Sequence, residues 1–225
     1  MINGWDVPNF FSQNSSLKSF SILSENKETH VSLVHNETLA YDYETCVGQL
    51  FQRNALKMVD AVYVKNNTIY FIEFKGGFDL NIRLDNFDMN RWYCNDAKRK
   101  CKQAAEIFME NQDHKISELI ASVNGKLVET YVTINKLILP MCATGDYSFR
   151  TVYVVVVDEI SQPLGAIEET LNALSGKGMN TINPISKLKD STRKYSISDA
   201  QGVPVFFDKI DVLNVSEFNV KFQDN

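Results

Sequence analysis

Three charged residues stand among apolar ones in the stretch from Val59 to Gly77 (VDAVYVKNNTIYFIEFKGG). They are Asp60, Glu73 and Lys75. Carboxylate oxygens are the ligands that hard divalent cations prefer, and a lysine amine can carry a proton or a positive charge for a reaction. If the chain brings these three side chains together, the stretch can hold a cation and move a proton beside it.

The two β-forming runs of this stretch flank Asn66-Asn67. Asparagine tolerates a positive φ, so the pair predicts a two-residue hairpin turn. Residues equally far from the turn then face each other, which sets Asp60 opposite Glu73. Glu73 and Lys75 share a face of the sheet through the pleat. The hairpin therefore predicts that two carboxylates and one amine converge on one spot.

Directly opposed carboxylates destabilise a strand pair, and the effect grows when they lose contact with water. A divalent cation removes this repulsion, so Asp60 and Glu73 are typical of half of a Mg²⁺ or Mn²⁺ site. The alternative is a solvent-facing strand in which Glu73 and Lys75 form an ion pair of little consequence.

This pattern resembles the PD-(D/E)XK nuclease superfamily. The resemblance rests on Asp60, on Glu73-Phe74-Lys75 thirteen residues later, and on an upstream helix that bears Glu44. Val59 stands where the family often has proline. The resemblance covers about residues 38–158.

The resemblance implies an α/β protein with a restriction-endonuclease-like α-β-β-β-α-β core, in which helices flank a mixed sheet. Additions at both ends would complete a single domain of residues 1–225, with the core at about 38–158 and a C-terminal extension at about 159–225. No clear first strand stands between Arg53 and Met58, so either the first helix ends early or another segment supplies the strand.

The patterns of apolar and capping residues predict the elements of this fold. A buried central strand is expected where β-branched residues are nearly continuous. The expected elements are short strands or loops in 1–37, a helix from a cap at Asn36 or Thr38 to about Arg53, the hairpin 58–75, a helix at about 90–122, a strand Lys126–Leu139, the central strand Arg150–Val157, a helix Pro163–Leu174, a basic loop 187–194, and strands at Val203–Phe207 and Val220–Phe222.

The resemblance also implies roles for individual residues. Asp60 and Glu73 would hold Mg or Mn, with the backbone carbonyl of Phe74 as a further ligand. Lys75 would orient or deprotonate the attacking water, or offset charge on the scissile phosphate. Glu44 would complete or flank the metal shell, although a lone glutamate on an amphipathic helix is just as often solvated.

A second cluster of charge is basic. Four of the five residues in Lys98-Arg99-Lys100-Cys101-Lys102 are Lys or Arg, and Gln103 follows. The family's second core helix often offers Lys or Gln to the phosphate backbone, which would make Lys98, Lys102 and Gln103 contacts to nucleic acid. Lys98 and Lys102 share a helix face, so they would act together. The alternative, to which we give equal weight, is that these residues form a solvent-exposed helix face without a binding role.

Composition excludes several classes of protein. The 225 residues carry a formal net charge of −5, which argues against blanket coating of a polyanion but not against a local basic groove. Three histidines and four cysteines without a C-x-x-C pair argue against a zinc site. The N-terminus has no basic n-region followed by an apolar h-region, and the longest apolar run is too short to cross a bilayer. We therefore expect a cytoplasmic protein with no membrane partner.

The sequence thus predicts a metal-dependent nuclease whose partner is nucleic acid, DNA being the family's usual substrate. Whether the protein forms a homodimer stays open. One alternative is a catalytically inactive relative that binds nucleic acid or a protein. The other is an unrelated α/β protein whose hairpin charges arose by chance.

Overall fold

The computed structural model describes residues 7–50, 57–83, 97–142, 149–162, 164–175 and 183–223. Six strands form one sheet and stand in it in chain order. The first four are antiparallel neighbours, whereas the fifth and sixth each run parallel to the strand before them. The strands are β1 (Leu17–Ser19), β2 (Leu39–Asp42), β3 (Ala61–Lys65), β4 (Thr68–Lys75), β5 (Arg150–Val157) and β6 (Lys209–Asn214).

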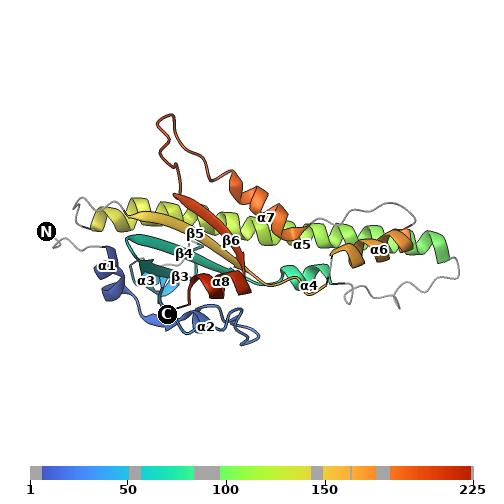
Figure 1. Cartoon of the computed structure of the whole chain (residues 1–225), viewed down its shortest axis with the longest axis horizontal. Coiled ribbons are helices and arrows are strands. Elements are labelled where there is room, and N and C mark those ends of the chain that lie inside the picture. The colour runs from blue at the N-terminus through green and yellow to red at the C-terminus, as the bar shows by residue number, and fades with distance from the viewer. Residues whose placement is uncertain are drawn as a thin grey trace.

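Helices flank this mixed sheet on both faces, so the expected α/β class is confirmed. The longest helix, α5, runs beside the sheet and continues past it, next to α4 and α6 (Figure 1). The helices are α1 (Val7–Asn14), α2 (Phe20–Leu23), α3 (Tyr43–Leu50), α4 (Phe78–Ile82), α5 (Ala97–Thr133), α6 (Leu164–Ser175), α7 (Pro184–Arg193) and α8 (Val215–Lys221). Among these described residues, no helix is both long and apolar enough to cross a membrane.

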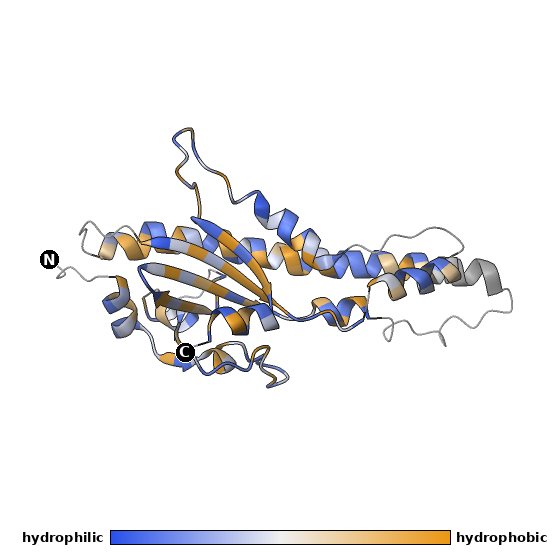
Figure 2. Cartoon of the chain, in the orientation of Figure 1, coloured by the Kyte–Doolittle hydropathy of each residue, from blue (hydrophilic) through white to orange (hydrophobic). Residues whose placement is uncertain are grey.

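The expected central strand is β5, which lies between β4 and β6. Its alternate residues enter two separate cores: Tyr153 and Val155 pack on the α5 side, while Val154 and Val156 pack on the side of α8. Burial on both faces explains why the run is almost continuously apolar. The colouring by hydropathy shows the same concentration of apolar residues along the central strands (Figure 2).

The hairpin β3–β4 has the predicted turn and register. Asn66 and Asn67 have φ values of 49° and 57°, which are the left-handed conformations of a type I′ turn. Ala61 pairs with Ile72 and Lys65 with Thr68, as the two-residue turn requires. The paired residues end at Ala61 and Ile72, with Asp60 directly before this pair and Glu73 directly after it, so the register that brings these two residues close is local in origin.

Substitution of Asn67 tests this turn. Asn67→Gly should raise the free energy of unfolding by up to about 1 kcal/mol, because glycine adopts a positive φ without steric cost. Asn67→Val should lower it by about 1–2 kcal/mol, since a β-branched residue is strained there. Urea unfolding of the two variants measures both changes. A loss of stability in Asn67→Gly would contradict the turn.

The prediction of a helix over residues 38–53 was wrong at its start. Leu39–Asp42 is β2, which pairs antiparallel with β3, and α3 begins only at Tyr43. The cap is Asp42, whose Oδ1 accepts the Thr45 N–H at 2.9 Å. Another segment thus supplies the strand that was not found between residues 53 and 58.

The predicted strand Lys126–Leu139 is also wrong, because α5 continues through Thr133 into a π-helical turn, Ile134–Ile138, and a 3-10 turn, Leu139–Met141. The buried residues of α5 and of the turn that follows it recur at helical spacing, and the alternation that predicted a strand was a misreading of this pattern. These buried residues are Ile116, Ile120, Val123, Leu127, Thr130, Ile134 and Ile138. The first residues of the predicted helix 90–122, residues 90–96, lie outside the described part of the chain.

Three expectations near the C-terminus need correction. The basic stretch 187–194 is mostly helical, since α7 starts at Pro184 behind an Asn183 cap. The run 203–207 is not a strand, and the sixth strand is β6 instead. The run 220–222 falls at the end of α8, a helix whose start is capped by Asn214 and Glu217 in a capping box. Because β6 pairs with β5, the C-terminal extension contributes to the same sheet as the core.

Candidate functional site

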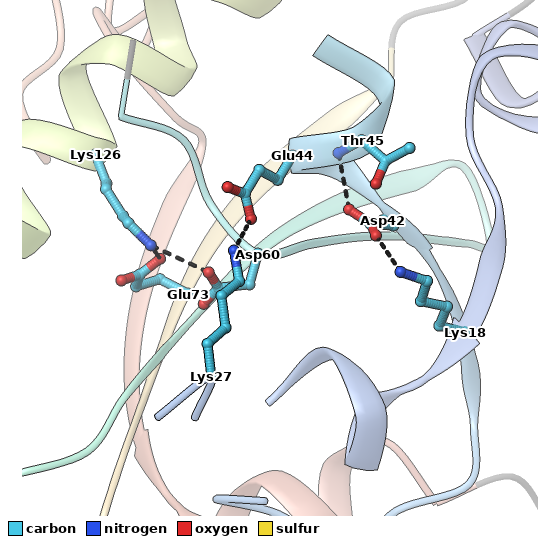
Figure 3. A network of polar contacts seen from close by, with 8 residues as sticks. All are labelled: Lys18, Lys27, Asp42, Glu44, Thr45, Asp60, Glu73 and Lys126. Carbon is cyan, nitrogen blue, oxygen red and sulfur yellow. Dashed lines mark hydrogen bonds and ion pairs between the residues drawn. The ribbon is translucent and has the colours of Figure 1, made fainter. Parts of the chain in front are cut away.

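Asp60 and Glu73 do converge, and a lysine lies between them (Figure 3). The Lys126 Nζ of α5 is 2.7 Å from Glu73 Oε2 and 3.1 Å from Asp60 Oδ1. One ammonium group therefore contacts both of the carboxylates that the hairpin brings together. The sequence predicted the pair but not this cation.

The backbone holds each carboxylate in place. Glu73 lies in β4, which pairs on one side with β3 and on the other with β5. Asp60 directly precedes β3, and its N–H donates to the Ile72 carbonyl at 3.1 Å. Its second oxygen, Oδ2, accepts the Phe74 N–H at 2.7 Å. The aspartate is thus tied to the strand that carries the glutamate.

Helix α5 fixes the chain just before Asp60. The Thr130 hydroxyl accepts the Val59 N–H at 3.3 Å, and the Glu129 carboxylate accepts the Lys57 N–H. These contacts place the Asp60 backbone against the same part of the helix that carries Lys126. Helix and hairpin are therefore aligned at the site by several independent contacts.

The electrostatics of the three groups follow from burial. Glu73 is only 1% exposed, whereas the side chains of Asp60 and Lys126 are 25% and 21% exposed. Burial, followed by repulsion from Asp60, raises the pKa of Glu73 well above its usual range. Burial lowers the pKa of Lys126, but the two carboxylates more than offset this and raise it overall. Two carboxylates thus share one ammonium at the site.

Lys75 lies on the same face of β4 as Glu73, as predicted from the pleat. Its Nζ donates to the Ser122 Oγ of α5 at 3.3 Å. Ser122 and Lys126 are one helical turn apart, so Lys75 contacts the same face of α5 from which Lys126 projects. The structure thus gathers Asp60, Glu73 and Lys75 at one place, as expected.

The end of β4 is anchored by Asp158, which follows β5. Its carboxylate accepts three consecutive backbone N–H groups, from Gly77 at 3.2 Å, Phe78 at 3.0 Å and Asp79 at 2.8 Å. Gly77 has a φ of 100°, a conformation that side-chain-bearing residues rarely adopt. This turn sets where the chain leaves the sheet directly after Lys75.

Glu44 lies beside Asp60, in the first turn of α3. The Tyr43 N–H donates to the Asp60 carbonyl at 3.3 Å, which joins the start of α3 to the hairpin. The Glu44 carboxylate pairs with Lys27 Nζ at 2.9 Å, and this hydrogen bond raises the pKa of Lys27. Glu44 therefore flanks the carboxylate pair, while its ion-pair partner is Lys27.

Two cavities meet at Asp60. One has a volume of about 620 Å³ and is lined by Glu44, Asp60 and Lys126 together with lysines of neighbouring segments. The other, of about 490 Å³, is lined by Asp60, Phe74 and Lys75. Leu23 and Glu25 also border both. The lysines at the first cavity are Lys18, Lys27, Lys57 and Lys126.

The carboxylate oxygens of Asp60 and Glu73 suit a divalent cation because they converge on one position. Asp60 and Glu73 already direct one oxygen each at a single positive charge, the Lys126 ammonium. Within the described ranges, no group of three or more His, Cys, Asp or Glu residues is arranged to hold a metal. Mg²⁺ is commonly held by one or two carboxylates, with water and substrate phosphate as its other ligands. The pair therefore fits such a cation if Lys126 moves aside.

The third oxygen expected at such a site is the Phe74 carbonyl. The N–H and C=O of one strand residue point to the same edge. Since the Phe74 N–H bonds Asp60, its carbonyl also points to the Asp60 side of β4. This direction agrees with the role that the resemblance implies for the carbonyl.

The expected nucleic-acid contacts lie far from these carboxylates. Lys98, Lys102 and Gln103 belong to the first two turns of α5. With a rise of about 1.5 Å per residue, Gln103 lies about 35 Å along the helix from Lys126. Gln103 is exposed, whereas the side chains of Lys98 and Lys102 lie outside the part that the structure describes. The structure does not bring Gln103 to the hairpin.

The residue that sequence reasoning missed is Lys126. It lies between the buried Val123 and Leu127 on the apolar stripe of α5. A lysine within an apolar stripe is the signal that could have found it, once the segment was read as a helix. No protein-family model, curated protein or solved structure matches this chain.

Proposed function

We propose that this protein is a metal-dependent nuclease that hydrolyses phosphodiester bonds in nucleic acid, with DNA as the expected substrate. The observation that carries the proposal is the convergence of Asp60 and Glu73 on one cation position beside a cavity of about 620 Å³. Carboxylates drawn together in this way suit a cation better than they suit a stable hairpin.

The order of elements supports the proposal. The antiparallel strands β2, β3 and β4 are followed by α5 and then by β5, which is parallel to β4. This order agrees with the β-β-β-α-β part of the core expected from the PD-(D/E)XK resemblance. One departure is α3, which lies between β2 and β3 and not before the first of the three strands.

The roles of the residues follow from their positions. Asp60 and Glu73 would hold Mg²⁺ or Mn²⁺, with the Phe74 carbonyl as a further ligand. Such a cation lowers the pKa of a bound water and stabilises negative charge on a phosphate. Lys75 would hold a proton or a positive charge at the edge of the second cavity. Glu44 would stabilise the outer part of the site.

The lysines around the first cavity support an anionic substrate. Lys18, Lys27 and Lys57 line it beside Asp60. Lysine ammonium groups bind backbone phosphates without reading the base sequence. Lys18 and Lys27 are paired with Asp42 and Glu44, so a phosphate would share them with these carboxylates.

A second candidate function is that of an inactive relative that binds nucleic acid or a protein. The observation in its favour is the ion pair that Lys126 makes with both carboxylates, since a carboxylate pair with its own ammonium is stable without a metal. The two functions differ in whether a divalent cation binds and in whether phosphodiester bonds are cut.

Calorimetric titration with Mn²⁺ distinguishes them. We expect one site per chain, and Asp60→Ala and Glu73→Ala should each weaken it by at least about a hundredfold, since losses in the outer shell alone cost 10–100-fold. Glu169→Ala, which removes an exposed carboxylate of α6, serves as the matched control and should bind Mn²⁺ as the wild type does.

The same proteins should be incubated with plasmid, linear DNA and RNA in Mg²⁺, Mn²⁺ or EDTA. The proposal requires cleavage that depends on the metal and that disappears in the Asp60 and Glu73 variants. Equal Mn²⁺ binding by all four proteins would overturn the metal site. Binding of Mn²⁺ without cleavage of any substrate would favour the inactive relative.

A further inference from the structure

Lys126 occupies the position that the proposed cation needs. Its Nζ contacts Glu73 Oε2 at 2.7 Å and Asp60 Oδ1 at 3.1 Å. A divalent cation that bound the same two oxygens would be a few ångströms from the ammonium. Two positive charges at such a separation repel strongly in a partly buried site. Ammonium and metal therefore exclude each other.

Lys126 has room to leave. It lies at the wall of the 620 Å³ cavity and its side chain is 21% exposed, whereas Glu73 beneath it is almost fully buried. Lysine carries its charge on a flexible four-carbon stem, so the ammonium can turn into this cavity while the α5 backbone stays in place. Glu44 lies on the same cavity wall and offers an alternative carboxylate.

We propose that Lys126 is a built-in competitor of the divalent cation: it is the counter-ion of Asp60 and Glu73 when no metal is bound, and it leaves them when metal binds. This inference rests on the proposed function, since it concerns the same two carboxylates. It predicts that the apparent metal affinity of the protein is reduced by the fraction of molecules in which Lys126 is away from the pair.

The test is calorimetric titration of Mn²⁺ into Lys126→Met and Lys126→Gln. Minor conformations typically make up about 0.1–10% of a protein, so removal of the competitor should tighten Mn²⁺ binding by about tenfold or more. Lys187→Met is the matched control. It removes another lysine that pairs with a carboxylate and packs against α5, at a distance from the site, and should leave the affinity unchanged.

A second readout is the melting temperature in EDTA and in saturating Mn²⁺. Removal of the ammonium takes the ion-pair partner from the buried Glu73 and from the partly exposed Asp60, so both Lys126 variants should melt earlier than wild type in EDTA. Mn²⁺ should then raise their melting temperature by more than it raises that of the wild type. Lys126→Gln keeps hydrogen-bond donors at the site, which provides a folded variant if Lys126→Met does not fold.

The outcomes separate this inference from the proposed function. Tighter Mn²⁺ binding in the Lys126 variants, with the larger thermal shift, supports the competitor. Equal or weaker binding in these variants, while Asp60→Ala still loses the metal, overturns the competitor and leaves the metal site intact. Absence of Mn²⁺ binding in the wild type and in both Lys126 variants overturns both.

Discussion

Asp60→Asn is expected to reduce cleavage of DNA by about a thousandfold, the upper end of the range for the loss of one preorganised electrostatic group. The substitution removes the negative charge of the more exposed member of the carboxylate pair. The asparagine oxygen can still accept the Phe74 N–H, so the local backbone keeps its main contact. The loss should therefore affect the chemical step and not the fold.

The stability of the same variant gives a separate result. Two carboxylates share one ammonium in the wild type, and the substitution leaves a balanced pair of Glu73 and Lys126. The metal-free protein should therefore keep its free energy of unfolding within about 1 kcal/mol of wild type. Urea unfolding in EDTA, beside single-turnover cleavage in Mg²⁺, measures both quantities. Loss of several kcal/mol with partial activity would show that Asp60 is structural.

Lys75→Ala should slow cleavage by about a hundredfold or more, the usual scale for losing a positioned acid–base or charge-stabilising group. Lys75 lies on the Glu73 face of β4 and lines the second cavity, next to Asp60. Binding of DNA in Ca²⁺ should change far less, because one phosphate contact among several is lost. The comparison of cleavage with binding therefore separates catalysis from attraction of the substrate.

Two further variants complete this experiment. Lys75→Arg should not restore the full rate, because a guanidinium does not give up its proton. Lys65→Ala removes a lysine from the turn end of the same hairpin and should cleave at the wild-type rate. Single-turnover kinetics of the three variants provide the measurement. Full activity in Lys75→Ala would exclude this hairpin as a PD-(D/E)XK active site.

Sequence reasoning located the part of the site that depends on local geometry. Asn66 and Asn67 determine the turn, the turn determines the register, and the register ends at the pair Ala61–Ile72, next to which Asp60 and Glu73 lie. Each step involves residues close together in the chain, so period and turn chemistry were sufficient. The central strand β5 was found for a similar reason, since its β-branched residues form a continuous run.

The contribution of α5 depends on contacts that are distant in sequence. Lys126 is separated from Glu73 by a difference of 53 in residue number, and nothing near the hairpin indicates it. The segment that carries it was also read with a period of two, because Val128, Tyr131 and Thr133 are good strand residues. Tertiary packing of the opposite, helical stripe overrode that preference. The segment around Lys126 had to be predicted as a helix before the role of this residue could be predicted.

Strand β2 was not predicted because it is short and is directly followed by a helix. Leu39 to Asp42 contribute only four residues, and the helical spacing that begins at Tyr43 extends backwards across them by coincidence. Asp42 ends the strand and caps the helix at once. A single residue with both functions leaves no loop in the sequence to mark the boundary.

Contacts between α5 and the hairpin recur once per helical turn: Ser122 meets Lys75, Lys126 meets Glu73, and Thr130 meets the backbone of Val59. A residue inserted into this part of the helix would turn everything beyond it by about 100°. The contacts on the two sides of the insertion could then not all survive. A slip of one residue in the hairpin would likewise move its carboxylates to the other face. Viable variants of this chain should therefore differ by substitution between residues 122 and 130 and within the hairpin, whereas changes of length should be confined to other segments.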